Sequence, residues 1–165
     1  MSSELEAFHQ ARRFSTVRED PGNAEHPVSA FFLDYWRSKL RGRNYPLIAD
    51  FVPKEVRAHL RSVVLIDALP DYSDFRYRLV GSSVCEYFLA NATGKTVSEA
   101  FESEHVARGI ASVYRRVCEL EKPLRVTGPP ITASDVFFPA YDCLYLPYSS
   151  DGRRVDRLVN TFAFR

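Results

Sequence analysis

Cysteine is scarce in this chain, and the few cysteines form no motif. There are 3 among 165 residues, at Cys85, Cys118 and Cys143. They are far apart, odd in number and include no Cys-x-x-Cys pair, which argues against a disulfide framework and against a structural zinc site. We expect them to be reduced and to pack as small apolar residues. A reactive sensing thiol is the alternative.

An excess of either charge is also missing. Lys and Arg together number 22 and Asp and Glu 21, which gives a formal net charge of +1. Dedicated nucleic-acid-binding domains carry a clear basic excess, so we expect no nucleic-acid partner. The basic run at positions 37–43 is better interpreted as cations at the end of a helix, where they complement the helix dipole.

Long apolar runs are absent as well. No stretch of the sequence approaches the roughly 20 apolar residues that span a bilayer, and residues 1–20 are polar and charged, unlike a signal peptide. We therefore expect a cytoplasmic protein with no membrane partner. Residues 1–27 are expected to form a flexible N-terminal arm, because residues 19–23 have the composition of a turn and Pro27 ends the segment.

The motifs of common catalytic sites are not found either. The sequence contains no Gly-x-Ser-x-Gly nucleophile elbow and no glycine-rich phosphate loop. Its four histidines are scattered without metal-ligand spacing. We predict no metal site and no catalytic residues, and hence a protein that is not an enzyme.

Aromatic side chains, by contrast, are plentiful, with 12 Phe and 9 Tyr. The first group of them lies in residues 28–62, which we expect to be a helical extension. Pro53 is suited to be the first residue of its second helix. The first helix has an apolar stripe at helical spacing, formed by Phe32, Tyr35, Trp36 and Leu40.

Residues 63–165 alternate between strand and helix patterns. A run of β-branched and aliphatic residues predicts a strand at 63–69, and a short turn joins it to a strand at 75–80 in an antiparallel hairpin. In the second strand Phe75, Tyr77 and Leu79 alternate with two arginines. We expect the aromatic side to face the core.

The rest of this region combines helices with three further strands. Ser83 and Glu86 have the spacing of a capping box and predict a short helix, and a regular apolar stripe predicts a long helix over 105–121. Strands are expected at 124–126, 136–148 (interrupted at Pro139) and 155–164. The order predicts an α+β fold, in which one five-stranded antiparallel sheet has helices on one face.

Several segments resemble bacterial stand-alone PAS proteins of the fifth PAS group. The motifs concerned are Tyr35-Trp36-Arg37, Tyr45-Pro46, Asp50-Phe51-Val52-Pro53, Arg76-Tyr77-Arg78-Leu79-Val80-Gly81 and Thr93-Gly94-Lys95. The resemblance covers residues 28–165 and implies a PAS-like core at 63–165. Pairing the first of the five strands with the last gives the spatial order 2-1-5-4-3.

The resemblance implies a sensory or regulatory role in signal transduction, through a small ligand or a protein partner. We expect a homodimer, with a separate signalling protein as its output because the chain ends soon after its last strand. No cofactor is predicted, since the flavin-type Asn-Cys-Arg motif is missing. His105, at the start of the long helix, is more typical of a cap or surface residue than of a haem ligand.

A ligand site is expected between the sheet and the helices of 82–121. Asn160 shares one face of the last strand with apolar residues, and its amide needs hydrogen-bond partners, which a ligand, a backbone carbonyl or a water could supply. Phe162 and Tyr114 are the other candidates on this side. Arg78 joins them only if its strand is reversed; otherwise Arg76 and Arg78 face solvent or pair with acids.

Two further hypotheses remain open. The stripe of Phe32, Tyr35, Trp36 and Leu40 could be an interface across a homodimer, since aromatic anchors are typical of interfaces, or it could pack on the sheet of its own chain. The rival to a sensor is a small cone-shaped α+β enzyme of the isomerase or dehydratase kind, which needs a buried base and a tyrosine donor. Asp142 and Tyr141 are its only candidates.

Overall fold

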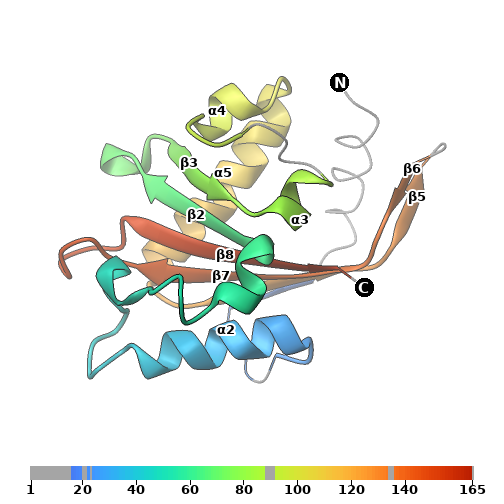
Figure 1. The fold of residues 1–165 in the computed structure, drawn as a ribbon. Coiled ribbons are helices and arrows are strands. Elements are labelled where there is room, and N and C mark those ends of the chain that lie inside the picture. The colour runs from blue at the N-terminus through green and yellow to red at the C-terminus, as the bar shows by residue number, and fades with distance from the viewer. Residues whose placement is uncertain (1–15, 20–21, 23, 88–91, 134–135, 165) are drawn as a thin grey trace.

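Six strands form one sheet in the computed structural model, which describes residues 16–19, 22, 24–87, 92–133 and 136–164. Each pair of neighbouring strands is antiparallel (Figure 1). The spatial order is β1 (Thr16–Arg18), β4 (Leu124–Gly128), β7 (Tyr141–Tyr148), β8 (Arg157–Phe164), β2 (Val63–Ala68) and β3 (Phe75–Val80).

The predicted strand order is confirmed. From β3 to β4 the sheet reads 2-1-5-4-3 in the order in which these five strands follow one another along the chain. The predicted sheet is extended by a sixth strand, β1, which pairs with β4 in the register Thr16 to Thr127. Part of the segment expected to be a flexible arm is therefore an edge strand, while residues 1–15 lie outside the described residues.

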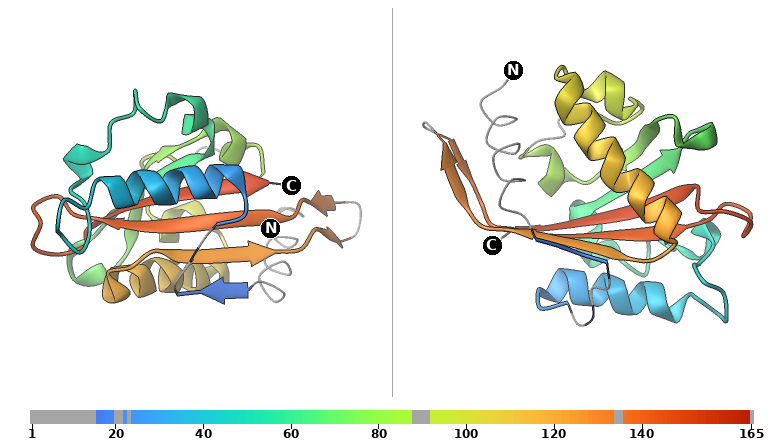
Figure 2. Two further views of the ribbon diagram at one scale, coloured as in Figure 1. Left: turned by 90° about the horizontal axis from the view of Figure 1, so that it is seen from below. Right: turned by 180° about the vertical axis from the view of Figure 1, so that it is seen from behind.

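Helices lie on both faces of the sheet, because the N-terminal extension packs on the sheet of its own chain, one of the two arrangements left open above. The long helix α5 (Glu104–Leu120) crosses one face together with the short helices α3 (Ser82–Cys85) and α4 (Val97–Ala100). Helix α2 (Pro27–Ser38) packs against the opposite face, below β7 and β8 (Figures 1 and 2). We call the α5 side the inner face and the α2 side the outer face.

The caps of these helices explain where they begin. The Ser103 hydroxyl accepts a hydrogen bond from the Val106 amide at the start of α5, and the His26 ring accepts one from Val28 at the start of α2. The predicted capping box at Ser83 and Glu86 is wrong, since α3 begins after Gly81 without a side-chain cap. A capping box is found at Thr96 and Glu99 instead, where it begins α4.

The second helix predicted for the N-terminal extension is also wrong. A short 3₁₀ helix, Arg57–Ser62, lies where it was expected, and another, Ile48–Asp50, lies before Pro53. Neither has a side-chain cap that would stabilise the start of an α-helix. The helix Arg57–Ser62 passes very close to Gly81. A Cβ at that position would come within 2.4 Å of the Arg61 carbonyl oxygen, so only glycine fits there. This close approach accounts for the glycine that ends the motif of residues 76–81.

Two irregularities shape the strands. Pro139 interrupts the long predicted strand, as expected, so that β6 (Val136–Phe138) pairs only with β5 (Ile131–Ala133) in a ribbon that projects from the sheet (Figure 2). A β-bulge shifts the register between Leu65 and Ile66 of β2, whose partners in β3 are Leu79 and Tyr77. The bulge turns Leu79 outward, where it is 39% exposed, so the expectation that Leu79 shares the buried side of Tyr77 is wrong.

Candidate functional site

The register of the sheet sorts its residues between the two faces. Directly opposed residues lie on the same face: Asn160 of β8 is opposite Tyr145 of β7 and Val64 of β2. The Tyr145 ring centroid is 6.0 Å from that of Tyr114 in α5, which places this set on the inner face. The inner-face residues of the three central strands are Val64, Ile66, Ala68, Tyr141, Cys143, Tyr145, Pro147, Leu158, Asn160, Phe162 and Phe164.

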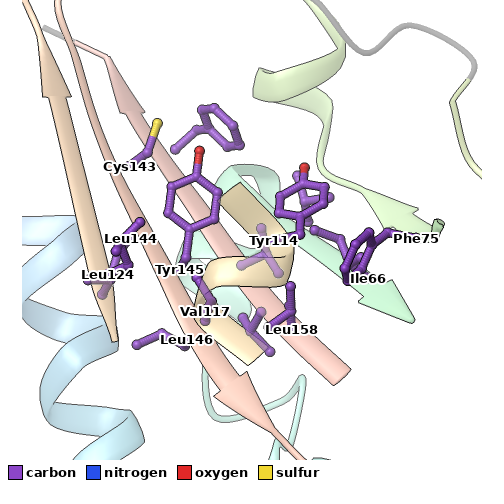
Figure 3. Packing of buried hydrophobic residues seen from close by; sticks show 14 of the residues in the cluster. Ile66, Phe75, Tyr114, Val117, Leu124, Cys143, Leu144, Tyr145, Leu146 and Leu158 are labelled. Carbon is purple, nitrogen blue, oxygen red and sulfur yellow. The ribbon is translucent and has the colours of Figure 1, made fainter. Parts of the chain in front are cut away.

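Tyrosine rings dominate the polar chemistry of the inner face. The Tyr77 and Tyr114 hydroxyl oxygens are 3.2 Å apart and both side chains are buried. Burial, followed by the neighbouring Tyr114, holds the pKa of Tyr77 well above its ordinary value. In Figure 3 the rings of Tyr114 and Tyr145 lie side by side, with both hydroxyl groups directed toward the same end of the core. The Tyr77 hydroxyl therefore remains protonated and neutral.

Asn160 is the polar group of this face whose bonding is incomplete. Its side chain is fully buried, and neither its amide nitrogen nor its carbonyl oxygen has a hydrogen-bond partner among the residues that the structure describes. Buried amides in folded proteins are almost always bonded to protein, water or ligand. The cluster of Asn160, Tyr145, Tyr114 and Tyr77 is accordingly the candidate ligand site.

The outer face carries a buried ion pair. The Arg125 guanidinium donates from Nε to Asp142 Oδ1 at 3.1 Å and from Nη2 to Oδ2 at 2.6 Å. The Ser29 hydroxyl of α2 donates to Oδ1 at 3.0 Å. The hydrogen bond with Asp142 raises the pKa of Arg125, so the charged form is favoured. The pair thus joins β4, β7 and α2 beneath the sheet.

One comparison with known proteins identifies the family. A family model described as PAS domain matches residues 24–162 of the chain. The chain belongs to the PAS domain family. Its matched region begins just before α2 and ends within β8. No curated protein and no solved structure gives a match.

The PAS domain brings three of the four predicted ligand residues together. Asn160 and Phe162 lie two residues apart on the inner face of β8, and Tyr114 approaches the same face from α5. Arg78 is not among them. It lies on the outer side of β3, exposed, and donates from both Nε and Nη2 to Asp67 Oδ2.

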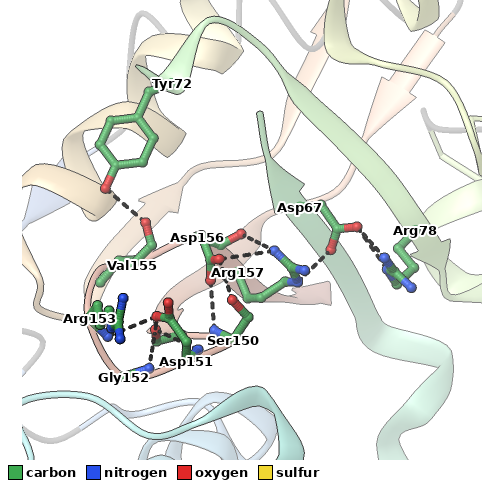
Figure 4. Close-up of polar contacts among 11 residues, drawn as sticks. Asp67, Tyr72, Arg78, Ser150, Asp151, Gly152, Arg153, Val155, Asp156 and Arg157 are labelled. Carbon is green, nitrogen blue, oxygen red and sulfur yellow. Dashed lines mark hydrogen bonds and ion pairs between the residues drawn. The ribbon is translucent and has the colours of Figure 1, made fainter. Parts of the chain in front are cut away.

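Figure 4 shows that Arg78 belongs to a separate network at the edge of the PAS domain. Asp67 forms ion pairs with two arginines. Its Oδ2 lies 2.6 Å from Arg78 Nη2, and its Oδ1 lies 3.1 Å from Arg157 Nε. Asp156 accepts from the backbone and side chain of Ser150 in the turn that joins β7 to β8. This network is partly exposed and fastens the turn to β2, so it is structural in character.

The stripe considered as a dimer interface packs partly within the PAS domain itself. Phe32 and Trp36 are buried, and the Trp36 indole donates to the Pro147 carbonyl oxygen at 2.8 Å. Tyr35 and Leu40 are half-buried at the margin of this packing. The outer face of the sheet is therefore the surface that covers Phe32 and Trp36 in the folded chain.

The residues considered for an enzyme are not arranged for proton transfer. Asp142 is fully buried and both of its oxygens accept hydrogen bonds from Arg125, so the carboxylate is engaged as a structural anion. Tyr141 points to the opposite face, since the two residues are neighbours in one strand. The pair cannot act on one substrate in this arrangement.

Other candidate chemistry is dispersed. Within the described ranges, no three His, Cys, Asp or Glu side chains are grouped as metal ligands, and no helix has the length and apolar character needed to cross a bilayer. His105 is exposed in the first turn of α5. Cys118 and Cys143 are buried free thiols, as expected, whereas Cys85 is half-buried.

Sequence reasoning missed two residues of the cluster. Tyr77 and Tyr145 were expected only as core aromatics of their strands, and their hydroxyl groups give no sequence signal of their own. The signal that was available is alternation: both tyrosines fall on the same period-two face as the inner residues of their strands. A polar oxygen at such a position predicts a bonded group inside the core.

Proposed function

We propose that this PAS domain is a sensor that binds a small molecule on the inner face of its sheet, against Asn160 and the tyrosines around it. PAS domains are in general sensory or signalling domains. The observation that carries the finer proposal is the Asn160 amide, which is buried and has no partner among the described residues. Leaving such a group unbonded costs about 1 to 3 kcal/mol, and a ligand that bonds to it recovers that cost.

The sheet offers a route from this site to the rest of the molecule. Asn160 and Tyr145 belong to β8 and β7, and the outer side of the same two strands carries α2. The Trp36 bond to Pro147 couples the helix directly to β7. A ligand that shifts β7 or β8 would therefore move α2. Self-association and the relay to a separate signalling protein, both expected from the resemblance, belong to this proposal.

Native mass spectrometry of gently purified protein tests the proposal. We expect a small molecule to be retained by the wild-type chain and lost from Asn160→Leu, which keeps the volume of the side chain without its polar atoms. Thr161→Val is the matched control, because Thr161 is the next residue of the same strand, is fully buried and faces outward. It should retain the molecule, and the same spectra report whether the protein is a monomer or a dimer.

Two results would contradict the proposal. One is a wild-type protein that carries only water on the inner face, which a high-resolution crystal structure would show as ordered density bonded to Asn160. The other is a molecule that Asn160→Leu retains as well as the wild type does, since its site would then lie elsewhere.

A further inference from the structure

The buried side chains of the inner face are uncharged among the described residues. Seven buried polar or charged residues are found among the described residues, and the charged ones are Arg125 and Asp142. Both lie on the outer face, bonded to each other. The helices above the inner face, with the residue that follows α4, contribute only uncharged buried side chains, namely Val84, Val97, Phe101, Val106, Ala107, Ile110, Tyr114, Val117 and Cys118.

Two titratable groups of the inner face, Cys143 and Tyr77, also stay uncharged. Burial holds the pKa of the Cys143 thiol well above its ordinary value, and Asp142, on the other side of the same strand, adds to the effect. The pKa of Tyr77 is raised in the same direction by burial and by Tyr114. A ligand that enters this region meets no buried counter-charge among the described residues, and a buried charge without a partner is strongly unfavourable.

Asn160 adds a directional requirement. A side-chain amide has two N–H donors and one carbonyl acceptor, and on Asn160 both the nitrogen and the oxygen are without a described partner. A ligand with only acceptors, or only donors, would leave one of the two unbonded. The neighbouring residues Tyr145 and Phe162 on the same face are aromatic, and aromatic rings suit a planar body.

We infer that the ligand of the inner face is an uncharged, planar molecule that presents a hydrogen-bond donor beside an acceptor, as a primary or cyclic amide does. This inference rests on the proposed function and specifies the chemistry of the same site. The two complementary hydrogen bonds to Asn160 determine the preference, and the neutral tyrosine-lined surroundings exclude carboxylates and ammonium or amidinium ions.

Three probes of nearly equal shape test the inference on the full chain. Benzamide has the neutral donor–acceptor pair, benzoate has acceptors and a negative charge, and benzamidinium has donors and a positive charge. Binding is measured by protein-observed NMR at neutral pH, with the Asn160 side-chain amide signals assigned by their disappearance in Asn160→Leu. We expect benzamide to bind at least about tenfold more tightly than either ion, since the ions leave part of a buried amide unbonded.

Variants locate the preference. Asn160→Leu should abolish the advantage of benzamide, whereas Thr161→Val should keep it. Benzoate or benzamidinium binding at Asn160 as tightly as benzamide would overturn the inference about ligand class and leave the proposed inner-face site standing. Benzamide binding that Asn160→Leu leaves unchanged would overturn the inference too, as would a failure of all three probes to move the Asn160 and Tyr145 signals.

Discussion

Arg125 and Asp142 on the outer face of the sheet complete each other's hydrogen bonds, whereas Asn160 on the inner face has no partner among the described residues. Both sets are buried, and they lie on the two sides of adjacent strands. The outer set is charged and closed by Ser29 of α2. The inner set is neutral, and the hydrogen bonds of its Asn160 amide are not completed by the described residues. Polar groups that satisfy one another stabilise a fold, whereas Asn160 leaves both a donor and an acceptor without a described partner.

The largest expected effect comes from breaking the outer pair. Asp142→Ala should lower the free energy of unfolding by about 3 to 5 kcal/mol, because the Arg125 charge is left buried without its partner. Urea unfolding measures the change. The double variant Arg125→Met/Asp142→Leu should recover most of the loss, since it removes both charges together. A single variant that costs less than about 1 kcal/mol would mean that the pair is not desolvated as the structure has it.

The second prediction concerns the helix that covers the outer face. Trp36→Ala should cost about 3 to 4 kcal/mol of stability, since it removes a buried ring and leaves the Pro147 carbonyl unbonded. Leu40→Ala, two residues beyond the end of the same helix and half-buried, should cost far less. Denaturant unfolding together with sedimentation distinguishes a role of Trp36 in the core of the monomer from a role in a dimer interface. A Trp36→Ala protein of unchanged stability that has become monomeric would support the earlier idea of an interface at this residue.

Sequence patterns predicted the central sheet because strand and helix periods are strong over residues 63–164. Apolar alternation in β2, β3 and β8 and the regular stripe of α5 each specify one buried side. The edge strand β1 could not be found in the same way. Its three residues are all exposed and too few to show a period, and it exists because β4 offers an unpaired edge.

The surface on which α2 packs was also left open by the sequence. Its stripe shows that the helix is buried on one side, but the bare face of the sheet and a second copy of the chain can both accept such a helix. The β-bulge at Leu79 escaped notice for a related reason, since one extra residue in a strand changes the alternation without any special residue type. Asn160 was found because a single amide interrupts an otherwise apolar face, while Tyr77 and Tyr145 look like ordinary core aromatics.

The third prediction is that a substitution on the inner face raises stability, whereas the two substitutions on the outer face lower it. Asn160→Leu should stabilise the ligand-free protein by about 1 to 2 kcal/mol, because it replaces an unbonded buried amide with an apolar group of similar size. The midpoint of thermal unfolding should rise in protein from which any ligand has been dialysed. Tyr77→Phe is the comparison, since its hydroxyl is bonded to Tyr114, and we expect it to lower stability by about 1 kcal/mol. A fall in stability for Asn160→Leu would show that the amide is bonded in the free protein.

The last prediction concerns the titration of the Cys118 thiol in α5, the helix above the inner face. Burial, with contributions from Asp156 and Glu119, raises the pKa of the Cys118 thiol from 9.0 to about 12. Between these values the unfolded chain loses the thiol proton while the folded chain keeps it. The contribution of Cys118 to the free energy of unfolding is therefore fully present below pH 9 and is lost as the pH rises toward 12. At about pH 10 the loss amounts to roughly 1.4 kcal/mol, one pKa unit of proton binding.

Cys118→Ala isolates this contribution. The variant pays a constant cost for its lost volume, so the difference in unfolding free energy from wild type should narrow between about pH 8 and about pH 10. Val113→Ala, a truncation on the same helix with no proton to lose, should keep a constant difference over that range. Parallel curves for Cys118→Ala would mean that the thiol titrates alike in both states. The α5 side of the sheet would then admit a charge, and the neutrality that separates it from the outer face would not hold at this position.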